Sequence, residues 1–386
     1  MTGIEPAAGT PVPAVGDLLR DLRPLVECES PSDDSAAVGR CADLVADYAT
    51  SQLDARPELP VAGHRHLRWQ WPAEPGGGRV LLLCHFDTVW PVGTLASMPW
   101  SVDGDVLRGP GTYDMKAGLV MAVRALADLR RSRELAGVTL LCTADEELGS
   151  PSSRELIEAQ AAAADAALVL EAAGPGGALK TARKGVGIYR LHIQGRAAHA
   201  GLEPENGVNA GVELAHQMLA CAQIADRAAG TSVVPTRSWA GTTINTVPAQ
   251  AKLHIDSRAW TAAEQQRVDV SLRGLQPRQP GATLTLAGGV NRPPLASTSA
   301  RPLFERARSV AAGLGLPEPS ECGVGGGSDG NFTAGVGTPT LDGLGAVGGG
   351  AHAEHEHVLI SELVPRTRLL AALVASLLDR PVAARR

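Results

Sequence analysis

Five short stretches of the chain, far apart in sequence, carry side chains that bind metal ions. They are His85 with Asp87, Asp114, Glu146 with Glu147, Glu171 and His352. Histidine nitrogens and carboxylate oxygens are ligands that zinc accepts. Two histidines and three carboxylates suffice for a pair of ions, and one further carboxylate remains to move protons. These residue types predict a two-metal hydrolase, because a protein that only binds a ligand has no use for the extra acid.

Three of these stretches follow apolar runs that are typical of buried strands. Residues 79–84 precede His85, residues 138–143 precede Glu146 and Glu147, and residues 166–170 precede Glu171. One acid after a strand is more often a helix cap or a loop residue, and Asp145 with its two neighbours could be an acidic turn. Ligand candidates after three separate strands favour a shared site, because sites in parallel sheets form beyond the carboxyl ends of the strands.

The elements that position these residues form an α/β pattern. Apolar spacing predicts helices at residues 15–28, 36–48, 117–130 and 152–163, alternating with the apolar strands. This alternation predicts a mostly parallel, mixed sheet flanked by helices.

The pattern changes after Arg183. Residues 186–193 and 251–258 alternate as antiparallel strands do, with helices at 208–221 and 262–275, so a second α+β domain is inserted into the first. The prolines at 293 and 294 mark its end, and helices follow at 302–314 and 361–378. The predicted division is 1–183, 184–292 and 293–386.

Composition narrows the class of protein. The 386 residues are 44% hydrophobic and carry a formal charge of -6, with no basic run that would indicate nucleic acid as a partner. No apolar stretch approaches the roughly 20 residues that span a bilayer, so no membrane association is expected. Residues 1–15 lack the pattern of a secretory signal, and the six cysteines have no paired spacing. We expect a cytoplasmic enzyme in which Cys84 and Cys142 are buried and reduced.

The motifs resemble those of a known family of enzymes. From about Pro31 to Val358 the chain is similar to the co-catalytic zinc metallopeptidases, which include glutamate carboxypeptidases that cleave folates, acetylornithine deacetylase, succinyl-diaminopimelate desuccinylase and aminoacylase. The segment 142–150 and the loop 325–329 most resemble the glutamate carboxypeptidase branch. The resemblance implies a zinc exopeptidase fold whose inserted domain acts as a lid and in dimerisation.

The resemblance also implies a role for each site residue. Asp114 bridges two Zn²⁺ ions, which Co²⁺ or Mn²⁺ can replace. His85 and Glu171 complete one metal site, and Glu147 and His352 complete the other. Glu146 is the general base, Asp87 holds the imidazole of His85, and the peptide bond after Asp114 is cis.

For the inserted domain, the resemblance implies contacts to substrate. His199 stabilises the oxyanion in the site of a partner subunit, which implies a homodimer. Asn245 and Arg258 hold the substrate's free carboxylate, and Gly327 lets the backbone approach the substrate. From the residues alone, His199 is more readily a solvated loop residue or a cap. Arg258 could instead belong to a salt-bridged sheet surface. His64 and His66 carry no evident role.

The predicted reaction is hydrolysis of an amide bond next to a free carboxylate. A glutamate carboxypeptidase that releases a C-terminal acidic residue is the first hypothesis. An N-acyl amino acid deacylase with the same metals and base is the second. A relative that binds a peptide or metabolite without catalysis is the third, and the complete set of ligands and base argues against it.

Overall fold

The computed structural model describes residues 14–382, which form two compact units. Unit 1 contains the described residues up to Ala182 together with Ala296–Val324 and the chain from Ser328 onward. Unit 2 contains Arg183–Leu295 and Gly325–Gly327. The predicted domain division at 184 and 292 stays a proposal, and the expectation for residues 1–15 falls mostly outside the described residues.

Unit 1 is built on a five-stranded sheet with the strand order β1-β5-β2-β6-β13. The strands are β1 (Leu67–Gln70), β5 (Val138–Thr143), β2 (Val80–His85), β6 (Ala166–Val169) and β13 (Thr340–Leu341). All neighbours pair in parallel except β1, which runs antiparallel to β5 at the edge. Every residue of β2 and β6 is buried, as expected of strands covered on both faces.

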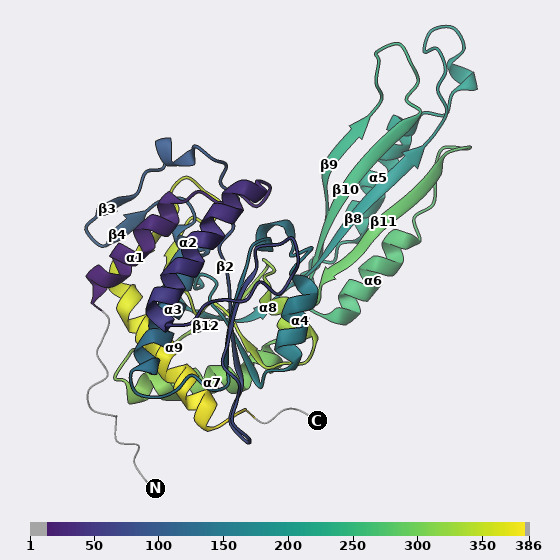
Figure 1. Ribbon diagram of the computed structural model, residues 1–386. Coiled ribbons are helices and arrows are strands. Elements are labelled where there is room, and N and C mark those ends of the chain that lie inside the picture. Colours follow the sequence, from purple (N-terminus) through teal and green to yellow (C-terminus); the bar gives the residue numbers. More distant parts are fainter. Residues whose placement is uncertain (1–13, 383–386) are drawn as a thin grey trace. The chain divides into compact units, whose positions relative to one another are not determined.

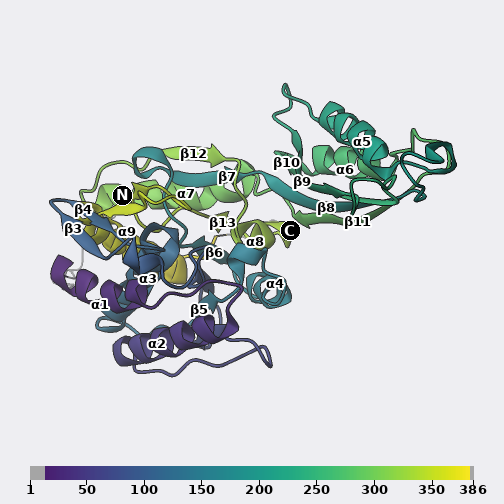
Figure 2. The ribbon, with the colours of Figure 1, turned by 90° about the horizontal axis from the view of Figure 1, so that it is seen from above.

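Helices cover both faces of this sheet (Figure 1). On one side α4 and α8 pack through Ile157 and Phe332 against Leu81, Leu83 and Leu141 of the strands. On the other side α3 and α9 lie against β2, with α1 and α2 packed on α3, and α7 packs against α9 and β13 (Figure 2). The bounds are α1 (Val15–Glu27), α2 (Ser35–Leu53), α3 (Ala117–Arg130), α4 (Arg154–Ala162), α7 (Ser297–Gly313), α8 (Gly330–Gly335) and α9 (Ile360–Asp379).

Two small sheets complete unit 1. One is four-stranded, with the order β14-β15-β4-β3, and the other pairs β12 with β7. Their bounds are β3 (Ser101–Asp103), β4 (Val106–Arg108), β14 (Gly348–Gly349), β15 (His357–Leu359), β7 (Leu179–Arg183) and β12 (Glu321–Val324).

Unit 2 is an antiparallel sheet with two helices on one face (Figure 2). Its strands are ordered β11-β8-β10-β9, and Tyr189, Leu191, Leu253 and Ile255 point into the core beneath the helices. The bounds are β8 (Gly185–Gln194), β9 (Ser232–Ala240), β10 (Gln250–Ala259), β11 (Thr283–Arg292), α5 (Ala210–Ile224) and α6 (Ala262–Arg273).

The predicted fold class is confirmed: a mostly parallel mixed sheet flanked by helices, with a separate antiparallel sheet. One helix start is wrong, because α7 begins at Ser297 and Pro302 lies inside it rather than at its first position. The patterns in the sequence do not predict the short edge strand β1 or the strands β9 and β11. All six cysteines are free, and Cys84 and Cys142 are buried partners in neighbouring strands. Within residues 14–382 no helix is both long and apolar enough to cross a membrane.

Candidate metal centre

The carboxyl ends of three neighbouring strands deliver ligand candidates to one place in unit 1. His85 is the last residue of β2, Glu146 and Glu147 begin a 3₁₀ turn after β5, and Glu171 follows β6 by two residues. Because β2 lies between β5 and β6 in the sheet, all three strand ends are adjacent. This arrangement is the one expected of a site at the edge of a parallel sheet.

Asp114 lies between the two histidines and offers one oxygen to each. Its Oδ1 is 3.4 Å from His85 Nε2, and its Oδ2 is 3.3 Å from His352 Nε2. The second contact of His85 Nε2 is Glu171 Oε1 at 3.5 Å, and that of His352 Nε2 is Glu147 Oε1 at 3.2 Å. The side chains therefore form two groups, each with one histidine and one glutamate, that share Asp114.

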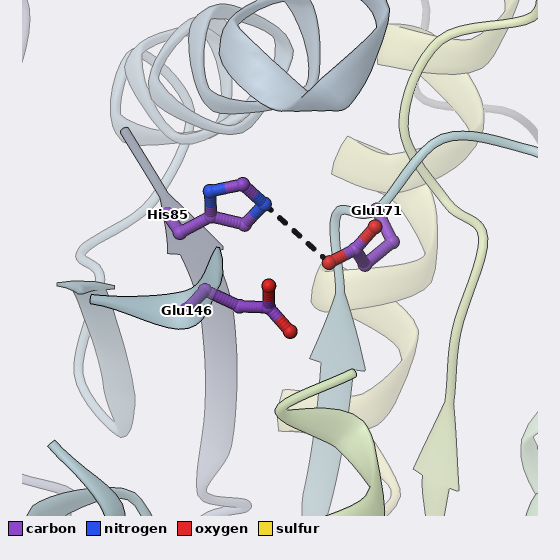
Figure 3. A group of neighbouring side chains, drawn as sticks. All are labelled: His85, Glu146 and Glu171. Carbon is purple, nitrogen blue, oxygen red and sulfur yellow. Dashed lines mark ion pairs between the residues drawn. The ribbon is translucent and has the colours of Figure 1, made fainter. Parts of the chain in front are cut away.

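Glu146 points into the same space. Figure 3 shows the carboxylates of Glu146 and Glu171 and the imidazole of His85 directed toward one another. One ligand atom from each of these three lies within 4.8 Å of the others, and the same is true of His85, Asp114 and Glu147. Glu146 is buried, so its carboxylate faces the cluster instead of bulk water.

Asp87 organises both the histidine and the acidic turn. His85 Nδ1 lies 3.0 Å from the backbone oxygen of Asp87 and 3.4 Å from its carboxylate. That carboxylate also accepts hydrogen bonds from the backbone N–H groups of Glu146 and Glu147 and from the hydroxyl of Ser32. Burial opposes its charge, yet these contacts keep the pKa of Asp87 below its usual value. Such an outer carboxylate fixes which imidazole nitrogen faces the ligands.

The buried Nε2 atom of His85 indicates that these residues suit a pair of metal ions. His85 Nε2 is buried and has no hydrogen-bond partner within residues 14–382, although carboxylate oxygens lie on two sides of it. A buried nitrogen is rarely left unsatisfied. A cation between this nitrogen and the carboxylates would satisfy it and also offset the repulsion among the acids.

The pKa shifts of the cluster residues also favour a bound cation. Hydrogen bonds with Asp114 and Glu147 raise the pKa of His352 to about 10. Burial lowers the pKa of His85, but its contacts with three carboxylates outweigh burial and raise it well above the usual value. Burial raises the pKa of Glu147. The carboxylates therefore favour positive charge at both histidines, and bound metal ions would supply positive charge at the same place.

The loop that carries His352 requires glycine at position 348. A Cβ on Gly348 would lie 2.0 Å from the carbonyl oxygen of His357, so only glycine allows β14 and β15 to approach this closely. His352 itself has a positive φ of 59° and a half-exposed side chain. His355 is exposed and His357 is partly buried in the neighbouring strand.

Glu356, four residues after His352, is a supporting residue whose role the sequence alone does not reveal. Its buried carboxylate accepts hydrogen bonds from the backbone N–H groups of Gly111, Tyr113 and Asp114, at 2.8 to 3.0 Å, and from the indole of Trp90 at 2.7 Å. The peptide bond after Asp114 is cis, as the resemblance implies. Glu356 therefore fixes the backbone that presents Asp114 to both histidines.

We expect Glu356→Ala to weaken metal binding by about 10- to 100-fold, as removal of an outer partner typically does. The variant should also unfold at a lower temperature, because each buried donor left unpaired costs about 1 to 3 kcal/mol. Metal titration and thermal unfolding measure the two effects. Glu354→Ala, an exposed position in the same loop, is the control and should change neither. Unchanged metal affinity in Glu356→Ala would remove this role.

His66 is a second residue whose position the sequence does not reveal. It is buried, its Nδ1 accepts from the backbone N–H of Ala144, and its Nε2 lies 2.9 Å from the hydroxyl of Ser152. Burial lowers the pKa of His66. The ring holds the segment that leads into Glu146.

The substrate-contact candidates His199 and Asn245 lie in unit 2, on adjoining loops. Residue 199 forms a bridge with Thr246, and the backbone N–H of Ala200 donates to the backbone oxygen of Asn245. Both side chains are exposed. His199 Nδ1 accepts hydrogen bonds from the backbone N–H groups of Gly201 and Leu202 at 3.1 Å. The ring proton therefore lies on Nε2, which remains a donor.

Arg258 and Gly327 also belong to unit 2. The guanidinium of Arg258 holds both carboxylate oxygens of Asp256 at 2.8 Å, the sheet-surface ion pair that the sequence left open as an alternative. The backbone oxygen of Gly327 lies 3.4 Å from a guanidinium nitrogen of Arg183.

A cluster of histidines and carboxylates at the end of a parallel sheet suits a metallohydrolase. The chain belongs to peptidase family M20/M25/M40, whose model matches residues 81–376. Carboxypeptidase G2 of Pseudomonas sp. (strain RS-16) is 33% identical over 316 residues, which cover 78% of this chain and 74% of that protein. The protein is thus a metal-dependent hydrolase of this family, similar to a carboxypeptidase.

Solved structures of low sequence identity share the fold. Aminopeptidase PepT from Bacillus cereus ATCC 10987 is 22% identical with a TM-score of 0.71, over 94% of this chain and 99% of that one. The M20 family metallo-carboxypeptidase Sso-CP2 from Sulfolobus solfataricus is 17% identical with a TM-score of 0.71, over 93% and 98%. The alignments extend over both units of the chain.

Proposed function

We propose that the protein is a two-zinc exopeptidase of the glutamate carboxypeptidase type, which releases a C-terminal acidic residue. The sharing of the two Asp114 oxygens between His85 and His352 is the observation that carries the proposal, because it suits two adjacent metal ions that share one carboxylate. Carboxypeptidase G2, at 33% identity, supports a carboxypeptidase, and the acidic residue rests on the resemblance to the glutamate carboxypeptidase branch. Zn²⁺ is the proposed ion, and Co²⁺ and Mn²⁺ share its preference for nitrogen and oxygen ligands.

The ligands divide between the two positions. His85 and Glu171 would hold one ion, Glu147 and His352 the other, and Asp114 both. The chemistry that a bound pair of ions would supply is polarisation of the substrate carbonyl and a lower pKa of the attacking water.

The protein's own groups would carry the proton. Glu146 lies among the ligand atoms and would accept the proton of the attacking water, then donate it to the leaving nitrogen. Asp87 would keep His85 in the tautomer whose Nε2 faces the ligands. Both acids are buried, which keeps bulk water from competing for the proton.

The inserted segment would recognise the substrate's end. Arg258 presents a planar group that binds a carboxylate through two hydrogen bonds, and Asn245 and Gly327 would add polar contacts. Because Arg258 holds Asp256, the substrate carboxylate would have to share or displace that partner.

We further propose that the enzyme is a homodimer in which His199 serves the partner's site. Ile244 is fully exposed and Leu202 is 79% exposed, on the loops that carry Asn245 and His199. Large apolar side chains exposed together commonly mark a protein interface.

A substrate panel tests the proposed class. On zinc-loaded protein, we expect kcat/KM for N-acyl-glutamates to exceed that for acetyl- and succinyl-amino acids by at least about tenfold, a ratio that a matched pocket supplies. The same panel with Glu146→Gln detects any contaminating hydrolase. A preference for acetyl or succinyl groups, whatever the amino acid, would favour the N-acyl amino acid deacylase instead. No hydrolysis of any member would favour a relative that only binds.

A further inference from the structure

One face of the unit 2 sheet carries a cluster of basic side chains. Both helices of this unit pack on the other face (Figures 1 and 2). Along β10 the buried residues alternate with Lys252, His254, Asp256 and Arg258, which point away from the helices. Along β8 the residues that point away include Arg190 and His192.

Strand pairing brings these side chains into two neighbouring rows. In one row Arg190, His254 and Arg237 stand directly opposite one another on β8, β10 and β9. In the next row His192, Lys252 and Trp239 do the same. Directly opposed side chains on one face have Cβ atoms about 4.5 to 5.5 Å apart. Three cationic side chains, two imidazoles and an indole therefore share one small area, which we call the basic face.

Three cations of the basic face have no charged partner among the residues that the structure describes. Arg190, Arg237 and Lys252 form no ion pair or side-chain hydrogen bond with any residue between 14 and 382. The carboxylate on the same face, Asp256, is occupied by Arg258. No two of these cations stand directly opposite one another, but Arg237 and Lys252 are diagonal neighbours on adjacent strands, close enough for long side chains to repel. The chain has a net charge of -6, so its overall composition does not account for the cluster.

The basic face is also hollowed. A cavity of about 390 Å³ is lined by Arg237, Ser238, Trp239, Lys252 and His254. The side chain of Trp239 forms one wall and is 46% exposed. A large exposed indole beside cationic groups offers a planar surface for stacking together with charge for an anion.

We propose that the basic face binds a small phosphorylated molecule that carries a planar ring, of the nucleoside polyphosphate class. The arginines suit phosphate oxygens through paired hydrogen bonds, and the ammonium of Lys252 adds a compact charge. The ring of the ligand would stack on Trp239. Binding would neutralise the repulsion among the three cations. This inference does not depend on the reaction proposed above.

Calorimetry on the full chain at low ionic strength tests the proposal with three probes. ATP carries both charge and ring, inorganic triphosphate carries charge alone, and adenosine carries the ring alone. We expect ATP to bind most tightly, triphosphate more weakly and adenosine least, with affinity for ATP falling as salt is added. Trp239→Leu should weaken ATP binding and leave triphosphate binding unchanged.

Charge variants provide the matched comparison. The double variant Arg237→Ala with Lys252→Ala should weaken ATP binding by at least about tenfold, since it removes two charge-assisted contacts. Arg273→Ala, which removes an arginine from helix α6 on the opposite face, should bind ATP as the unchanged protein does. The double variant should melt at the same or a higher temperature, because it relieves repulsion.

Four results would overturn the proposal. The first is the absence of ATP and triphosphate binding at millimolar concentration. The second is equal loss of binding in Arg273→Ala and in the double variant, which would show unspecific attraction. The third is a lower melting temperature of the double variant, which would mean that its side chains serve the fold. Binding of a DNA duplex without binding of either phosphate probe would also reject a small-molecule site.

Discussion

Glu146→Gln should retain its metal ions and lose turnover, with kcat reduced by roughly 10²- to 10⁴-fold, the usual range for a general acid or base. Glutamine has nearly the same shape as glutamate but accepts no proton at neutral pH. Glu146 lies within 4.8 Å of His85 and Glu171, close enough to reach a water among the ligands. Its backbone contact to Asp87 is unaffected by the change, so the acidic turn should keep its conformation.

Metal content and kcat, measured on the same preparation, separate the roles of the two neighbouring acids. Glu147→Gln should lose one metal ion as well as activity, because Glu147 contacts His352 at 3.2 Å. Glu155→Gln, an exposed acid on α4, removes the same charge and should alter neither quantity. Full activity in Glu146→Gln would remove it from the role of base. Loss of metal in this variant would assign it as a ligand instead.

Three of the candidate ligands leave a local signal in the sequence, whereas the roles of Asp114 and His352 rest on the resemblance. His85, Glu147 and Glu171 each end or follow an apolar strand, and the strands are long enough to be read from hydrophobicity alone. If three neighbouring strands run in parallel, their carboxyl ends lie at the same edge of the sheet, and the residues that follow them are predicted to lie close together. Helix α3 likewise has the same bounds, Ala117–Arg130, in sequence and structure.

The supporting residues leave no such signal, because their partners are distant in sequence. Glu356 holds the backbone of residues 111–114, more than 240 positions away, and a buried acid cannot be told from an exposed one by its neighbours alone. His66 lies in a polar segment, and the sequence indicates no role for it. Its side chain is nevertheless buried and accepts a hydrogen bond from the backbone of Ala144.

The basic face of unit 2 could not be predicted from the sequence either, for a different reason. The chain contains no basic run, and the cluster exists only because Arg190, Arg237 and Lys252 come from three strands in a particular register. Period-two patterns predict which residues share a face of one strand, but not which residues of another strand lie beside them. A count of charges along the sequence therefore misses it.

His199→Ala should lower kcat by roughly 10²- to 10³-fold, the usual effect of losing one donor to a developing oxyanion. Because Nδ1 of His199 accepts two backbone hydrogen bonds, its Nε2–H is a positioned donor and not a freely turning ring. The metal content should be unchanged, since the metal ligands all lie in unit 1. His216→Ala, an exposed histidine on α5, is the control and should retain activity.

Mixing two inactive variants tests whether His199 acts in the partner's site. A mixed dimer of Glu146→Gln with His199→Ala contains one site that has both Glu146 and a partner's His199, so random exchange should restore roughly a quarter of the full activity. If His199 acts within its own subunit, every site in the mixture lacks one of the two groups and activity stays absent. Light scattering gives the second measurement, because the trans arrangement requires that any monomeric variant be inactive. A fully active monomer would therefore contradict the proposed dimer as directly as failed complementation.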